Sequence, residues 1–129
     1  MSDELLNQVK GLYAAWDRGD MESVLAAVHP NASLINDVPL PWGGHYTGPQ
    51  GFAEFFGKLL AGLDTKVESE EMIVSGDNVL QIGRTRGTVR ATGKPFDARE
   101  VHILRFRDGQ VVSFEVLLDS RQMQAAIAQ

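Results

Sequence analysis

A carboxylate in a loop rich in proline, glycine and aromatic residues is the first candidate for chemistry in this sequence. The loop lies within residues 31–56, NASLINDVPLPWGGHYTGPQGFAEFF, between a short apolar run and the start of a helix. Asp37 stands there beside Val38, Leu40 and Trp42. Near the mouth of an apolar cavity, a carboxylate binds a proton more tightly than in water and can act as a base near neutral pH. The alternative is an Asx turn, in which Asp37 bonds to the backbone of its own loop.

His102 is the second candidate, and it lies in a predicted strand, 96–107. Because side chains alternate between the two faces of a strand, His102 shares a face with Leu104 and Phe106, which we expect in the core. A neutral histidine that faces a cavity can donate a hydrogen bond to a carbonyl group or shuttle a proton. The alternative is a core histidine whose ring is satisfied by a neighbouring carboxylate such as Glu100.

Several large side chains are candidates to line a small-molecule pocket. Trp42 lies between Pro41 and Gly43, where it would gate a pocket more readily than fill a core. Tyr46 is a third catalytic candidate, because it could supply a hydroxyl group, although packing at the start of the following helix is an equal alternative. The other candidates for substrate binding, each of which could instead belong to an ordinary core, are Trp16, Phe52, Phe56, Met72 and Phe114.

Arginines gather on one face of the predicted sheet. Arg84, Arg86 and Arg90 alternate along one strand, and Arg105 lies on the next strand. Such a group could clamp an anion. The interpretation that we favour is a solvated or dimer-facing side of the sheet, paired with acidic residues.

Patterns typical of metal and cofactor sites are missing from the sequence. Its three histidines, His29, His45 and His102, have neither helical ligand spacing nor a cluster of carboxylates beside them. The sequence has no glycine-rich phosphate loop and no elbow motif for a serine nucleophile, and it contains no cysteine. We therefore expect no metal and no cofactor.

The length of 129 residues and the hydrophobic content of 43% predict a single globular domain spanning 1–129. A net charge of −5 argues against nucleic acid as the main partner. No run approaches the ~18 apolar residues of a membrane span, and the first ten residues lack the apolar core of a signal peptide. We expect a cytoplasmic protein without a membrane partner.

Helices come first along the chain and strands follow. Apolar residues at helical spacing predict a first helix that stops at Gly19, a second that starts after Asp20, includes Val28 and closes before Pro30, and a third from Thr47 to about Gly62. A brief strand is expected at 32–35. From Thr65 the period changes to two, and turn-forming residues separate the predicted strands 65–75, 78–91, 96–107 and 110–118. A short final helix should turn Met123 and Ile127 inward. The order predicts an α+β domain with an antiparallel meander.

Four motifs in this order resemble those of the nuclear transport factor 2-like superfamily, and most closely its SnoaL-like polyketide cyclases and ketosteroid isomerase relatives. They are WDRGD at 16–20, GGHYTG at 43–48, SGDNV at 75–79 and LRFRDGQVV at 104–112. The resemblance covers nearly the whole chain. It implies a cone-shaped, curved antiparallel sheet wrapped by three N-terminal helices around a pocket, with a short C-terminal helix, and it implies a homodimer.

The resemblance also implies roles for particular positions. Ketosteroid isomerases use a loop carboxylate as base, together with a tyrosine and a protonated aspartate that bond to the enolate. Counted along the motifs, Asp37 falls at or within one residue of the base, and His102 falls at the position of the protonated aspartate. Leu12 falls where the catalytic tyrosine of the family lies.

Three functions compete on this basis. The first is an isomerase or cyclase, in which Asp37 removes a proton next to a carbonyl group and His102 or Tyr46 stabilises the enolate. The second is a non-catalytic binder of an apolar small molecule. The third is a structural dimer module. The expected dimer uses the outer face of the sheet, where an apolar patch would otherwise face water: Val101, Ile103, Val111 and Leu117.

Overall fold

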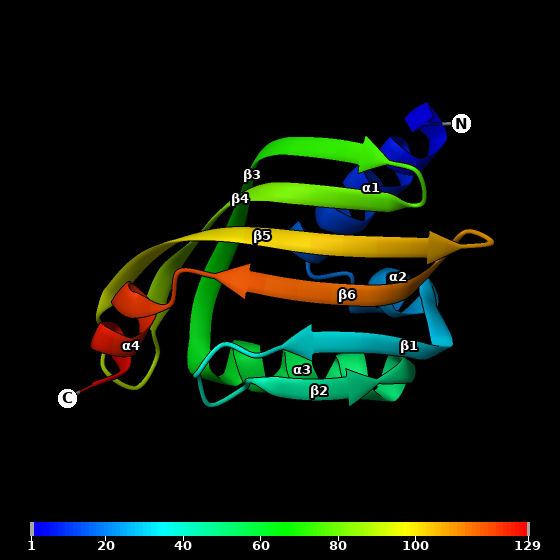
Figure 1. Ribbon diagram of the computed structural model, residues 1–129. Helices are drawn as coiled ribbons and strands as arrows, with labels where there is room; N and C mark the ends of the chain where they lie inside the picture. Colours follow the sequence, from blue (N-terminus) through cyan, green and yellow to red (C-terminus); the bar gives the residue numbers. More distant parts are fainter. Residues whose placement is uncertain (1, 129) are drawn as a thin grey trace.

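The computed structural model describes residues 2–128, which form four helices and six strands (Figure 1). The helices are α1 (Ser2–Asp17), α2 (Met21–Ala26), α3 (Gly48–Gly62) and α4 (Arg121–Ile127). The strands are β1 (Val28–Asn36), β2 (Gly44–Thr47), β3 (Leu63–Ser75), β4 (Asn78–Val89), β5 (Pro95–Arg107) and β6 (Gln110–Leu118). The predicted α+β class is confirmed. None of the described helices is both long and apolar enough to cross a membrane.

All six strands belong to one curved, open sheet in the order β2-β1-β6-β5-β4-β3 (Figure 1). Strands β3 to β6 form the predicted antiparallel meander. One pair departs from the expected antiparallel sheet, because β1 runs parallel to β6. A parallel pair needs a long connection, and here α3 and three strands of the meander lie between its members, so no local turn signal marks it.

Two boundaries near the N-terminus differ from the sequence prediction. β1 begins at Val28, which we assigned to the second helix; Val28 is buried and pairs with Val111 of β6. The short strand β2 was not predicted, because it begins at the second of two consecutive glycines and reads as loop. Its partner is β1, with Asn36 opposite Gly44. The result is a hairpin whose connecting loop carries Asp37 and Trp42.

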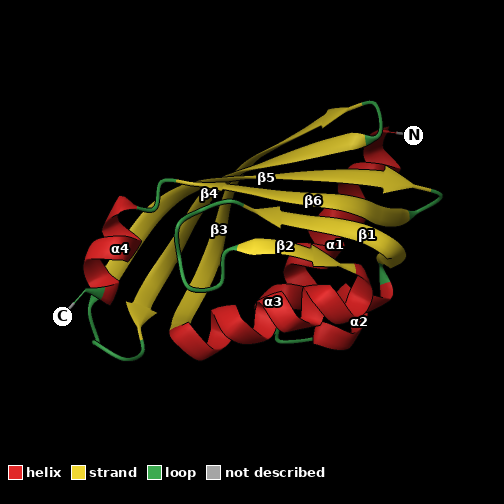
Figure 2. Ribbon diagram, turned by 60° about the horizontal axis from the view of Figure 1, so that its bottom comes forward, coloured by secondary structure: helices red, strands yellow, loops and turns green. Residues whose placement is uncertain are grey.

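Helices α1, α2 and α3 lie against the concave face of the sheet, and α4 lies at one end beside β5 (Figure 2). α3 buries an aromatic stripe at helical spacing, Phe52, Phe55 and Phe56, against the sheet. In α4, Met123 is buried as predicted, and Ile127 is partly buried against the core. The helices and the bent sheet therefore face one another across the centre of the domain.

Two glycines allow β3 and β4 to approach closely where the sheet bends. A Cβ atom at Gly83 would overlap the backbone oxygen of Glu68, and one at Gly87 would overlap that of Asp64. Neither position has the left-handed backbone that favours glycine, so the reason for glycine here is space. β3 also carries an irregularity between Ser69 and Glu71. On one side of this bend, Thr65 and Val67 of β3 and Thr85 of β4 line the cavity.

A second irregularity lies in β6 and reverses a prediction about the outer face. Arg105 pairs with Ser113 but Phe106 pairs with Val111, so Val112 is an extra residue in this strand. The extra residue turns Val111 inward, where it is only 4% exposed. The expectation that Val111 belongs to the outer apolar patch is therefore wrong.

Two members of the arginine group, Arg84 and Arg86, form ion pairs on the sheet surface, and none of the four lines the cavity. Arg84 Nη1 lies 3.0 Å from Asp97 Oδ1, and Arg86 Nε lies 3.1 Å from Asp97 Oδ2. The hydrogen bond from Arg84 lowers the pKa of Asp97. Further pairs link these arginines to Glu70 and Glu68 of β3. This arrangement agrees with a solvated face whose charges are paired. The guanidinium groups of Arg84 and Arg86 already contact carboxylates, so they are not free to clamp an anion.

Candidate active site

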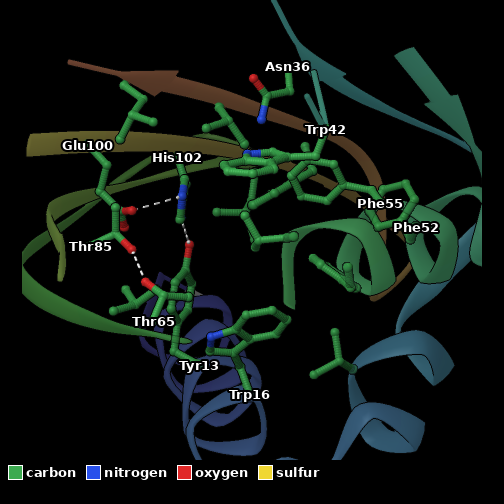
Figure 3. Close-up of a pocket in the computed structure, with 18 of the residues that line it drawn as sticks. Tyr13, Trp16, Asn36, Trp42, Phe52, Phe55, Thr65, Thr85, Glu100 and His102 are labelled. Carbon is green, nitrogen blue, oxygen red and sulfur yellow. Dashed lines mark hydrogen bonds and ion pairs between the residues drawn. The ribbon is translucent and has the colours of Figure 1, made fainter. Parts of the chain in front are cut away.

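An apolar cavity of about 120 Å³ lies between the concave sheet face and helices α1 to α3 (Figure 3). Most of its wall is hydrocarbon and aromatic ring. The aromatic side chains that line it, apart from one tyrosine and one histidine, are Trp16, Trp42, Phe52, Phe55, Phe56 and Phe114. A cavity of this kind, with few polar groups in its wall, is the usual form of a site for a small organic molecule.

Helix and strand periodicity place the polar groups in this wall. On α1, Tyr13 and Trp16 share the side that faces the cavity. On β5, Glu100, His102 and Leu104 alternate with outward residues, and all three are buried, as the period-two pattern predicts for His102. Gln81 of β4 is opposite His102 in the sheet and is fully buried. Helix α1 and two central strands thus bring four polar side chains together.

Hydrogen bonds and one ion pair connect these four side chains, of which Tyr13, Glu100 and His102 are shown in Figure 3. Tyr13 Oη lies 2.7 Å from His102 Nδ1, and His102 Nε2 lies 3.4 Å from Glu100 Oε1. Gln81 Nε2 donates to Glu100 Oε2 at 2.8 Å and lies 3.1 Å from His102 Nδ1. Gln81 Oε1 has no partner among the residues described. We name this group the Tyr13–His102–Glu100 chain, with Gln81 bracing it from β4.

The partners assign the proton positions in the chain. The Tyr13 hydroxyl and the Gln81 amide both donate to Nδ1 of His102, so the ring carries its proton on Nε2, which faces Glu100 Oε1 at 3.4 Å. Burial lowers the pKa of His102 from its ordinary value of 6.5, and the charge of Glu100 opposes that shift. Burial first, and the charge of Glu100 second, raise the pKa of Tyr13 well above its ordinary value of 10.0. Both rings are therefore neutral at neutral pH.

The lowered pKa of His102 predicts a pH dependence of stability. Below pH ~6.5 the unfolded chain binds a proton at this histidine that the folded chain resists, so the free energy of unfolding should fall as the pH falls, by at most about 1.4 kcal/mol per pH unit. The groups that face the ring are Glu100, Tyr13 and Gln81. Urea unfolding at pH 7.5, 6.5 and 5.5 measures this loss in the wild type and in His102→Phe.

The variant lacks the titrating ring, so its loss between pH 7.5 and 5.5 should be smaller than that of the wild type. His29 and His45 are common to both proteins and cancel in the difference. A wild type that gains stability relative to His102→Phe in acid would show that Glu100 holds His102 as a cation, which contradicts the assignment.

Two further polar features face the cavity. Asn36, at the end of β1, is only 2% exposed and lies beside Trp42 in the wall (Figure 3). Thr65 and Thr85 share a hydrogen bond of 2.6 Å between their hydroxyl oxygens. These groups lie on three different strands, so the polar points of the cavity are spread over its sheet wall.

Asp37 lies outside this cavity. Its side chain is 76% exposed, and its carboxylate pairs at 2.8 Å with the equally surface-placed His45. The expectation that Asp37 and His102 face one cavity is therefore wrong, because β1 ends at Asn36 and the next residue turns to the opposite side. The Asx turn in this loop belongs to Asn36, whose Oδ1 accepts from the backbone N–H of Val38.

Other candidates divide between the cavity and ordinary packing. Tyr46 is buried outside the cavity wall, and its hydroxyl donates to the Trp42 carbonyl oxygen at 2.9 Å. Met72 lies in a separate surface hollow beside Leu6 and Lys10, so its placement in the pocket was wrong. Trp42 does line the cavity, but at 4% exposure and packed on Gly62 it is a fixed wall, not an exposed gate. Trp16, Phe52, Phe56 and Phe114 line it as expected.

Sequence reasoning missed Tyr13, Asn36 and Gln81 as members of the site. Tyr13 is one residue from Leu12, where the motif count put the family's tyrosine, and Asn36 is one residue from Asp37. Each error is a shift of one position, which moves a side chain by about 100° on a helix and to the other face at a strand end. For Gln81 the sequence does contain a signal, because a glutamine at an inward position between Val79 and Gly83 needs a polar partner.

Comparisons with known proteins agree with this fold. A family model described as a SnoaL-like domain matches residues 9–114. An NTF2-like protein of unknown function from Burkholderia pseudomallei K96243 is 27% identical over 100% of both chains, with a TM-score of 0.90. TerC, co-crystallized with polyporic acid, is 23% identical over 95% of this chain and 97% of its own, with a TM-score of 0.84.

A putative SnoaL-like polyketide cyclase from Shewanella denitrificans OS-217 is 17% identical over 95% of this chain and 96% of its own, with a TM-score of 0.79. Because TerC and this putative cyclase are both less than 25% identical to the chain, their likeness concerns the fold alone. No curated protein is similar enough to this chain to count as a match.

Proposed function

Because the chain belongs to the SnoaL-like domain family, we propose that its cavity binds a small, mostly apolar carbonyl compound and that the Tyr13–His102–Glu100 chain moves a proton on it. The observation that carries this proposal is the 2.7 Å contact between Tyr13 Oη and a neutral, carboxylate-oriented His102 inside an apolar wall. The reaction class is isomerisation or aldol cyclisation. TerC, which was co-crystallized with polyporic acid, and the putative SnoaL-like polyketide cyclase share this fold, which supports the proposal of a small organic ligand.

The proposed step follows the logic of a base that acts through a hydroxyl group. Tyr13 Oη takes a proton from the carbon next to the ligand carbonyl while its own proton passes to His102 Nδ1. The C–H bond breaks, its electron pair enters the enolate, and a new N–H bond forms on the ring. Glu100 faces Nε2 and stabilises the imidazolium that results.

The Tyr13–His102–Glu100 chain lets two neutral groups transfer a proton, although the raised pKa of Tyr13 makes it a poor acid and the lowered pKa of His102 makes it a poor base. A tyrosine whose pKa is raised does not lose its proton to water at neutral pH. Transfer to His102 avoids a free phenolate, because the charge develops on an imidazole ring beside a buried carboxylate. The surrounding rings, Phe114 at 5.0 Å from the His102 ring among them, exclude water and strengthen that attraction. The proton returns from His102 through Tyr13 to another carbon in an isomerisation.

Proton exchange on a model ketone tests the proposal. 1-Tetralone is a bicyclic ketone with two exchangeable protons on the carbon next to its carbonyl group. In D₂O with the wild-type protein, NMR should show their replacement by deuterium faster than in buffer or with heat-unfolded protein. Binding is followed separately by tryptophan fluorescence, because the only two tryptophans of the sequence, Trp16 and Trp42, both line the cavity. A ketone that binds but exchanges no faster than in buffer would contradict the proposed proton transfer.

Non-catalytic binding of an apolar small molecule is the second candidate. The specific observation in its favour is that the loop carboxylate, Asp37, lies outside the cavity and pairs with His45. A molecule that copurifies with the protein, identified by mass spectrometry, would distinguish the two functions if it is recovered unchanged after incubation with the protein.

A homodimer through the outer sheet face is also part of the proposal. Val101 and Ile103 are only partly buried in the single chain, and Leu117 is 47% exposed. Ile103→Glu should convert the dimer into a monomer, because a charge would be buried in an apolar contact. Light scattering at micromolar concentration measures the mass, and Ala53→Glu on the exposed side of α3 is the control. A wild type that is already monomeric would contradict this part.

A further inference from the structure

Asn36 presents a hydrogen-bond donor to the cavity. Its side chain is 2% exposed and lies in the cavity wall. The backbone N–H of Val38 donates to Oδ1 at 3.1 Å, which fixes which end of the amide faces the loop. Nδ2 therefore points the other way, toward the cavity (Figure 3). Among the described residues, the side-chain hydrogen bonds include none from this Nδ2.

An N–H group that opens into an apolar cavity and has no acceptor in the protein gains free energy when a bound molecule supplies one. Trp42, whose ring offers no strong acceptor, lies beside Asn36 in the cavity wall (Figure 3). We propose that Asn36 is a ligand-binding residue, and that its amide donates to an acceptor oxygen, such as a ketone oxygen, on the molecule that the cavity holds. This inference rests on the proposed function in one respect, that the cavity is a binding site.

The register of the sheet relates Asn36 to the Tyr13–His102–Glu100 chain. Ile35 of β1 pairs with Glu115 of β6, so Asn36 lies beside Val116, and Val116 pairs with His102 of β5. Asn36 and His102 are thus in one row with one strand between them, about 10 Å apart at their Cα atoms. Val116 forms the apolar floor between them and lines the cavity.

This row implies the chemical class of the ligand. It is an apolar molecule about the size of one or two rings, with an acceptor oxygen at Asn36 and its reactive carbon toward Tyr13. A ligand whose oxygen carries a hydrogen, such as an alcohol, fits less well, because its O–H group would have no acceptor at Asn36. Asn36 therefore selects ketones over the corresponding alcohols and hydrocarbons.

Matched probes of one shape test this selection: 1-tetralone, 1-tetralol and the hydrocarbon tetralin. The dissociation constant of each is measured by tryptophan fluorescence. Asn36→Leu should weaken 1-tetralone by about 5- to 10-fold, the effect of one neutral hydrogen bond, and change tetralin by less than about 2-fold. Asn31→Leu makes the same change at an exposed position of the same strand and should alter neither probe.

Asn36→Asp keeps an acceptor for Val38 N–H and so preserves the loop if the leucine variant fails to fold. At pH 8 the new carboxylate turns a donor into an acceptor, and the preference should invert, with 1-tetralol bound more tightly than 1-tetralone.

Three results overturn the inference. An unchanged ratio of 1-tetralone to tetralin binding in Asn36→Leu would remove Asn36 from recognition and leave the proposed function intact. The same conclusion would follow if 1-tetralone keeps its advantage over 1-tetralol in Asn36→Asp. If none of the three probes binds the wild type, the cavity is not a site for this class of molecule, and the proposed function fails together with the inference.

Discussion

Tyr13→Phe should reduce proton exchange on 1-tetralone to the rate in buffer, a loss of about 100-fold or more in the protein-dependent rate. The substitution removes one oxygen atom, which is the atom that contacts both the ligand and His102 Nδ1 in the proposed step. His102→Phe should reduce the rate as much, because it leaves the Tyr13 proton without an acceptor. NMR exchange measurements under saturating ketone, with binding followed by tryptophan fluorescence, separate loss of transfer from loss of affinity.

Asp37→Asn is the control for this experiment. Its carboxylate is 76% exposed and bonded to His45, so its replacement should leave exchange within about 2-fold of the wild-type rate and the stability nearly unchanged. If Asp37→Asn abolishes exchange and Tyr13→Phe does not, the loop carboxylate is the base and the Tyr13–His102–Glu100 chain is structural.

Gly87→Ala should destabilise the fold by about 3 kcal/mol, at the upper end of the cost of forcing one carbon into a filled space. The new Cβ would overlap the Asp64 carbonyl oxygen and would lie 2.9 Å from the Thr65 Cα atom. These are backbone atoms, which cannot turn aside as a flexible side chain can, so β3 and β4 must separate at the bend. Thermal and urea unfolding measure the loss.

The chain offers a matched control for this substitution. Gly57 lies on the exposed side of α3 with ordinary helical backbone, and no atom outside its own helix lies within 4 Å of the place that a Cβ atom would occupy. Gly57→Ala should therefore stabilise the protein by roughly 0.5–1 kcal/mol, the difference between alanine and glycine in a helix. Equal effects of the two substitutions would show that close approach of β3 and β4 does not govern the stability of the bend.

Periodicity predicted those parts of the fold whose signals are local. The alternation along 96–107 placed His102 on the inward face, and every second residue from Phe96 to Phe106 is buried. Turn-forming residues located the hairpins of the meander. The pairing of β1 with β6 was beyond such reasoning, because it joins segments separated by most of the chain and no short turn connects them. The bulge at Val112 was equally invisible, since one extra residue leaves no compositional mark.

The site was predictable as a region but not atom by atom. Trp16, Phe56, His102 and Phe114 were identified correctly as residues of the cavity wall. The error at Asp37 arose because the end of a strand decides which of two neighbouring side chains faces inward, and strand ends are the least certain part of a sequence prediction. Chemistry made the wrong neighbour more attractive, since a carboxylate is a better base than the amide of Asn36.

The aromatic stripe of α3 lines the cavity opposite the sheet wall that carries Asn36 and His102. This separation has an evolutionary consequence. Phe52, Phe55 and Phe56 set how much room a guest molecule has, while the hydrogen-bonding groups of the proposed reaction stand on α1, β1 and β5. Exchanging a phenylalanine of the helix for a smaller residue enlarges the room without moving those groups. Descendants of this chain can therefore diverge in the size of the molecules they accept and keep one chemistry. The reason is that the residues that set cavity size and the residues that transfer protons or donate hydrogen bonds belong to different elements.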